Sequence, residues 1–168
     1  MNTGPVVIGF DGTPAAERAI RQAAQLLSAR PALVVVVWEA EQAFELATLP
    51  VMGMELPATR MDIRVAAEAD HARYETAQEA ARHGAAIARE AGLQAESMVV
   101  ADEVTVAETL VRVARDCDAP AIVVGAHRRG ALAGLLLGST SRDVLKHSDR
   151  PVVVVRESEQ GAGDDSGG

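Results

Sequence analysis

Aromatic residues are scarce in this sequence of 168 residues. Phenylalanine, tryptophan and tyrosine together make up 2% of the chain, whereas hydrophobic residues as a whole make up 48%. The interior must therefore be built from Ala, Val, Leu and Ile, which favours closely stacked helices and strands. The same scarcity leaves no aromatic platform on which single-stranded nucleic acid stacks.

Cysteine is represented by Cys117 alone, which excludes an intramolecular disulfide and a cysteine-rich metal site. Long hydrophobic runs are also missing. The apolar run at residues 32–38 has the length of a strand, whereas a membrane-spanning helix needs about 20 apolar residues. Residues 1–5 are too few and uncharged for a signal peptide. We therefore expect a cytoplasmic protein without a membrane partner.

Positive charge is not in excess either. The formal net charge is −8, from 24 acidic residues against 16 Lys and Arg. Because no basic face is evident, nucleic acid and anionic membrane surfaces are not expected as partners. Residues 157–168 contain four acids and lack the apolar residues needed to order them. We expect one domain over residues 1–156, followed by a disordered acidic tail over 157–168.

Apolar runs alternate with helical patterns along the chain. The apolar runs predict five strands, at residues 6–10, 32–38, 95–100, 121–124 and 152–155. Helical spacing predicts helices over residues 14–28, 61–91 and 106–117 and from 139 onward. Continuous apolar strands that alternate with helices indicate a parallel sheet covered on both faces. We therefore predict an α/β fold, a three-layer α/β/α sandwich. Residues 39–60 are irregular and long for a connection, which suggests a functional flap.

A glycine-spaced loop follows the fourth predicted strand. It begins at Gly125 and ends at Gly138, and Ser139, Thr140 and Ser141 then open a predicted helix. Backbone N–H groups and the helix dipole at such a helix start attract anions. The stretch therefore predicts a phosphate cradle. The alternative is a glycine-rich connection with an ordinary Ser/Thr helix cap.

Ligands of doubly wound sheets bind outside the carboxyl ends of the strands, where the strand order reverses. Asp11 follows the first strand, and it either accepts hydrogen bonds from a ribose or base or forms an Asx turn. Arg128 and Arg129 in the glycine loop either pair with phosphates or are solvated loop charges. No Walker A pattern is present, and the histidines lack metal-ligand spacing. Catalysis is weakly supported.

Four stretches of the chain read I-G-F-D-G-T at residues 8–13, V-V-V-W-E at 35–39, V-V-G-x-x-x-x-G-x-x-x-G-L-L-L-G-S-x-S at 123–141 and V-L-x-H-S-x-x-P-V-V-V-V-R at 144–156. Together they resemble the universal stress protein family. The resemblance covers nearly the whole chain. It implies a homodimeric fold with a five-stranded parallel sheet of order 3-2-1-4-5, paired through the last strand, Val152–Val155.

Members of the family that bind ATP resemble one another in one loop, which reads Gly, two residues, Gly, nine residues, Gly, then Ser or Thr. Gly125, Gly138 and Ser139 match this pattern, and Gly130 matches a further glycine often found in the loop. Arg128 stands at the second glycine position, which is a departure. Its side chain either crowds the approach of the phosphates or turns its guanidinium onto them.

The resemblance also implies an adenine side of the site. Asp11 and Val37 fall where the family holds ribose and adenine, with Gly9 beside them. The expected phosphate side comprises Gly125, Arg128, Gly130, Gly138, Ser139 and Thr140. The resemblance implies ATP as the ligand, with AMP or cyclic AMP as related candidates and Mg²⁺ entering through the phosphates.

Three hypotheses on function follow. The first is a stress-response module that binds ATP or a related adenine nucleotide without rapid turnover. The second is a nucleotide-free dimeric interaction protein, whose apolar segment at residues 51–56 meets a partner. The third is a slow ATPase with water as the nucleophile, for which the sequence shows no convincing general base.

Overall fold

The computed structural model describes residues 3–27, 30–38, 60–102, 104–126 and 138–156. The strands are β1 (Val6–Gly9), β2 (Pro31–Trp38), β3 (Gln94–Ala101), β4 (Ile122–Gly125) and β5 (Val152–Val155). They form a five-stranded parallel sheet of order β3-β2-β1-β4-β5. The described helices are α1 (Pro14–Leu26), α3 (Arg60–Glu90), α4 (Val106–Asp116) and α5 (Ser139–His147). The predicted α/β sandwich and its strand order are confirmed, with element ends moved by one or two residues.

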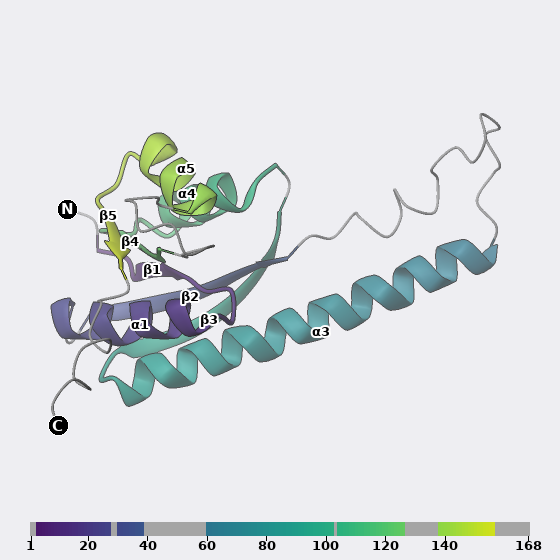
Figure 1. Cartoon of the computed structure of the whole chain (residues 1–168), viewed down its shortest axis with the longest axis horizontal. Coiled ribbons are helices and arrows are strands. Elements are labelled where there is room, and N and C mark those ends of the chain that lie inside the picture. The colour runs from purple at the N-terminus through teal and green to yellow at the C-terminus, as the bar shows by residue number, and fades with distance from the viewer. Residues whose placement is uncertain (1–2, 28–29, 39–59, 103, 127–137, 157–168) are drawn as a thin grey trace, which may run out of the picture.

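Helices α1 and α3 lie on one face of the sheet, and α4 and α5 lie on the other (Figure 1). A hydrophobic core fills the space on each face. Val34 of β2 packs on the side of α1 and α3, whereas its neighbour Val35 packs on the side of α4. Both side chains are fully buried because successive residues of a strand face opposite sides of the sheet. This double burial explains why the second strand reads as one continuous apolar run.

Side chains cap two of the helices at their N-termini. The Thr13 hydroxyl accepts a hydrogen bond from the Ala16 N–H at 3.2 Å, with Pro14 at the first helical position. The Thr105 hydroxyl accepts one from the Glu108 N–H at 3.2 Å. Threonine is among the residues favoured at this position, because its hydroxyl satisfies an N–H group that has no partner within the helix. Helix α5 differs, because its N-cap is Gly138 and no side chain caps it.

Helix α3 runs unbroken through Gly84. A Cβ atom at this position would lie 2.9 Å from Phe10 Cδ1 and 2.9 Å from Val34 Cγ1. The glycine therefore lets the helix pack closely against the sheet. The N-terminal turns of α3 extend beyond the carboxyl ends of β2 and β3 (Figure 1).

Some expectations concern segments that the structure does not describe. The predicted flap at 39–60 lies outside the described residues except for Arg60, which begins α3. The predicted acidic tail at 157–168 lies outside them as well. Within the described ranges, no helix is long and apolar enough to cross a membrane.

Candidate functional site

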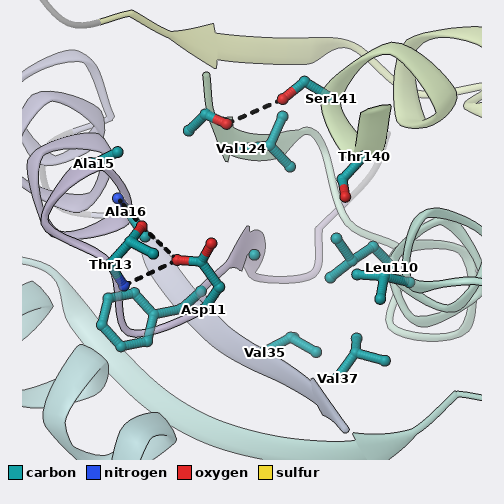
Figure 2. A pocket seen from close by; sticks show the side chains of 14 residues that line it. Asp11, Thr13, Ala15, Ala16, Val35, Val37, Leu110, Val124, Thr140 and Ser141 are labelled. Atoms are coloured by element: carbon teal, nitrogen blue, oxygen red, sulfur yellow. Dashed lines mark hydrogen bonds between the residues drawn. The ribbon is translucent and has the colours of Figure 1, made fainter. Parts of the chain in front are cut away.

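A pocket of about 220 Å³ lies at the carboxyl ends of β1, β2 and β4 (Figure 2). The N-terminal turns of α1, α4 and α5 complete its described walls. The strand order reverses between the neighbours β1 and β4, so the pocket lies where doubly wound sheets bind their ligands. Its described lining comprises Gly9, Phe10, Asp11, Thr13, Ala15, Ala16, Val35, Val37, Val106, Leu110, Val124, Gly125, Thr140 and Ser141.

One side of the pocket is apolar. Val35, Val37 and Leu110 lie together there, below the polar residues of α5 (Figure 2). Gly9 lets Leu110 pack closely against β1, because a Cβ at this position would lie 3.0 Å from Leu110 Cδ1. The result is an apolar wall without a charged group, which suits a flat ring system.

Asp11 supplies the only titratable side chain among the described lining residues. Its Oδ1 accepts two hydrogen bonds from Thr13, one from the backbone N–H at 3.0 Å and one from the hydroxyl at 2.6 Å. The Asx-turn interpretation of Asp11 is therefore confirmed. The side chain is exposed, and Oδ2 takes no part in these two bonds. The turn thus orients the carboxylate and leaves its second oxygen for a ligand.

Helix α5 contributes Thr140 and Ser141 to the opposite wall. Ser141 is 2% exposed, and its Oγ donates a hydrogen bond to the Gly125 carbonyl at 3.0 Å. This bond joins the first turn of α5 to the end of β4. Sequence reasoning counted Ser141 among the helix-opening residues and missed this role, because only burial distinguishes it from its neighbours.

Gly125 is placed at the pocket as predicted, and it also has a packing role. A Cβ atom there would lie 3.3 Å from the Ala15 carbonyl oxygen, which is tighter than ordinary van der Waals contact. The missing side chain therefore allows α1 to approach the end of β4.

The remaining predicted site residues divide into two groups. Gly138 and Ser139 lie at the start of α5, beside the lining residue Thr140, but they are not part of the described lining. Ser139 is exposed. Arg128 and Gly130 belong to residues 127–137, which lie outside the described residues. Their predicted contacts with phosphate stay predictions.

A hydrogen-bonded pair of side chains, His83 and Glu17, lies next to Phe10, which lines the pocket. His83 Nε2 of α3 lies 3.3 Å from Glu17 Oε1 of α1, and the His83 and Phe10 rings are 6.3 Å apart between centroids. The hydrogen bond from His83 lowers the pKa of Glu17, and Arg21 at 3.4 Å adds to the effect. The pair therefore links α1 to α3 beside the pocket.

The comparisons with known proteins agree with this fold. A family model described as "Universal stress protein family" matches residues 2–156, and the chain belongs to this family. A universal stress protein of Mycobacterium tuberculosis is 30% identical over 154 residues, which make up 92% of this chain and 46% of the relative. The chain thus spans about half the length of the curated relatives it matches.

Three solved structures of similar proteins carry nucleotides. A universal stress protein of Archaeoglobus fulgidus in complex with dAMP is 25% identical, with a TM-score of 0.55 and coverage of 92% of this chain and 98% of that one. An Arabidopsis thaliana family protein with AMP bound is 15% identical, with a TM-score of 0.59 and coverage of 93% of both chains. A universal stress protein in complex with cAMP is 22% identical, with a TM-score of 0.55 and coverage of 93% and 98%.

Proposed function

We propose that this chain binds an adenine nucleotide, ATP or a related nucleotide such as AMP or cyclic AMP. One observation carries the proposal. A single pocket brings together an apolar wall, an oriented carboxylate and a helix N-terminus without a side-chain cap. These are the three surroundings that a base, a ribose and a phosphate chain need. The nucleotide complexes of related proteins support the same ligand class.

The base and the ribose occupy the side formed by the strands. The adenine ring lies against Val37 and Leu110, beside Gly9. The Asp11 carboxylate accepts hydrogen bonds from the ribose hydroxyls through Oδ2. Thr13 holds Oδ1 in place at 2.6 Å and 3.0 Å, so the carboxylate is oriented before the nucleotide binds, which lowers the entropic cost of binding.

The phosphates lie at the start of α5. The first N–H groups of a helix have no partner within the helix, and the N-cap Gly138 supplies no side-chain acceptor to them. They are donors for an anion, together with the hydroxyls of Ser139 and Thr140. Among the described residues no group of three or more His, Cys, Asp or Glu could hold a metal ion, so Mg²⁺ enters on the phosphates.

Arg128 favours a second candidate function. It replaces the second glycine of the ATP-binding pattern, and a side chain there that blocks the phosphates leaves a nucleotide-free interaction protein of the same family. A side chain that turns its guanidinium onto the phosphates instead adds a bidentate contact. Arg128→Gly separates the two cases. It creates or strengthens nucleotide binding if the arginine blocks the phosphates, and it weakens binding if the guanidinium contacts them.

Mass spectrometry of nucleotides released from the purified protein tests the main proposal directly. Calorimetry with Mg-ATP, AMP and cyclic AMP then ranks the ligands. Asp11→Asn keeps an acceptor for the Thr13 turn but removes the charge, and it should weaken binding about tenfold, the effect of one charge-assisted hydrogen bond. Asp116→Asn is the matched control, because Asp116 is exposed on α4 and does not line the pocket. No heat and no thermal shift at millimolar nucleotide refutes nucleotide binding, whereas copurified ATP refutes the nucleotide-free alternative.

We also propose a homodimer through β5, which is an edge strand of the sheet. The carbonyls of Pro151 and Val155 accept hydrogen bonds from the N–H groups of Ile122 and Ala126, at 2.9 Å and 2.7 Å. Alternate residues of a strand turn their backbone groups to the same side, so Val154 turns its N–H away from β4. An open apolar edge of this kind invites pairing with a second strand. A strictly monomeric mass in solution contradicts this proposal.

A further inference from the structure

A second hollow, of about 300 Å³, lies between α3 and the edge strand β3. Its described lining comprises Tyr74, Gln78, Ala81, Arg82, Ser97 and Val99. None of these residues lines the nucleotide pocket. We name this hollow the α3–β3 groove.

The periodicity of the helix and that of the strand bring the polar residues of the groove together. Tyr74, Gln78 and Arg82 are four residues apart along α3, which places them on one face of the helix. Ser97 and Val99 alternate along β3 and face the same side of the sheet, where Val99 packs against the core beneath α1 and α3. The helix face and the strand face therefore meet across the groove.

The polar side chains of the groove have no protein partner within the described residues. No hydrogen bond or ion pair there engages Gln78, Arg82 or Ser97, although acids outnumber bases in this chain. The other residue, Tyr74, packs its ring against Trp38 at 5.6 Å between centroids, which leaves the hydroxyl available. Arg89 on the same helix, by contrast, donates to the Ala95 carbonyl at 2.8 Å.

We propose that the α3–β3 groove binds a small phosphate-bearing anion. Arg82 offers a planar set of N–H donors, and the Tyr74 and Ser97 hydroxyls and the Gln78 amide add neutral donors around the same space. No carboxylate lines the groove within the described residues. Because Arg82 is exposed, water weakens its attraction, and we expect a dissociation constant on the order of millimolar.

Trp38 makes the site observable. It is the single tryptophan of the chain, it contacts Tyr74 of the groove, and it lies next to Val37 of the nucleotide pocket in sequence. Its fluorescence therefore reports events at either site. Backbone amide shifts of Gln78 and Ser97 report the groove alone, and those of Ser139 and Thr140 report the nucleotide pocket.

The experiment titrates inorganic phosphate into the ¹⁵N-labelled full chain at pH 7, with ionic strength held constant by sodium chloride. We expect saturable shifts at Gln78 and Ser97. Arg82→Gln should weaken this binding about tenfold or more, because it removes the charge-assisted hydrogen bonds. Glutamine is a good helix former, so the variant should keep α3 folded, and its circular dichroism melting curve checks this.

Arg112→Gln is the matched control, because it removes an equal charge from an exposed position on α4. The Arg112 guanidinium lies 3.9 Å from the Asp116 carboxylate on the same helix. This variant should leave the phosphate titration unchanged. The proposal is overturned if the shifts at Gln78 and Ser97 do not saturate, or if Arg82→Gln and Arg112→Gln weaken them equally. It is also overturned if phosphate shifts only Ser139 and Thr140, a result that would support the nucleotide pocket instead.

Discussion

Ser141→Ala should destabilise the fold although it removes a single oxygen atom. Ser141 is 2% exposed, and its Oγ donates to the Gly125 carbonyl at 3.0 Å. A hydrogen bond of this kind contributes about 1 kcal/mol net, and the half-buried Gly125 carbonyl left without its partner raises the cost to at most about 3 kcal/mol. We therefore expect a loss of about 1–3 kcal/mol, which lowers Tm by roughly 2–4 °C per kcal/mol in a chain of this size.

Ser139→Ala is the matched control, because it deletes the same atom two residues earlier in the same helix. Ser139 is exposed, so its hydroxyl exchanges only water on folding, and the change should stay within about 0.5 kcal/mol. Urea unfolding of both variants is followed by circular dichroism at one fixed protein concentration. The slope m should stay unchanged, so that a shift in midpoint measures stability.

The order of the two variants should reverse when nucleotide affinity is measured in place of stability. Ser139→Ala removes a proposed phosphate donor and should weaken Mg-ATP without loss of stability. Our interpretation of Ser141 is refuted if its alanine variant unfolds at the wild-type midpoint. A larger loss of stability in Ser139→Ala than in Ser141→Ala contradicts it equally, because burial would then not decide the cost.

Three further predictions concern other parts of the molecule. Gly84→Ala should destabilise the fold, because the added Cβ would lie 2.9 Å from Phe10 Cδ1. Overpacking costs about 1–3 kcal/mol, more than the roughly 0.5–1 kcal/mol gained in helix propensity. A variant that is more stable than the wild type in urea unfolding argues against tight packing at Gly84. His83→Gln should raise the pKa of Glu17 in a ¹³C NMR titration, because His83 is the main cause of its lowering. A carboxyl group whose pKa is lowered in the folded state stabilises the protein above its unfolded-state pKa, and this stabilisation is lost as the pH falls. The variant should therefore lose less stability on acidification. An unchanged Glu17 pKa would reject the interaction of His83 with Glu17. Val154→Pro should shift the proposed dimer to monomer in light scattering, since it removes an outward N–H without breaking a bond to β4, and a dimer that persists rules out pairing through this edge.

Local patterns predicted most of the fold. The apolar run of β2 and the helical spacing of α1 and α4 each depend on residues close together in the chain, and the structure confirms them. The central pairing of β1 with β4 joins residues far apart in the chain, and only the resemblance to a family implied it. Asp11 shows the same limit, because its turn was foreseeable from the sequence, whereas its place in the pocket wall required the fold.

The sequence by itself determined the element types, the three-layer class and the family, because hydrophobic periodicity and glycine spacing are properties of neighbouring residues. Only the tertiary structure decided which equivalent-looking residues matter. It buried Ser141 against β4 and left Ser139 exposed, and it set Arg82 of α3 opposite Ser97 of β3. Burial and convergence depend on long-range packing, which places residues side by side irrespective of their separation along the chain.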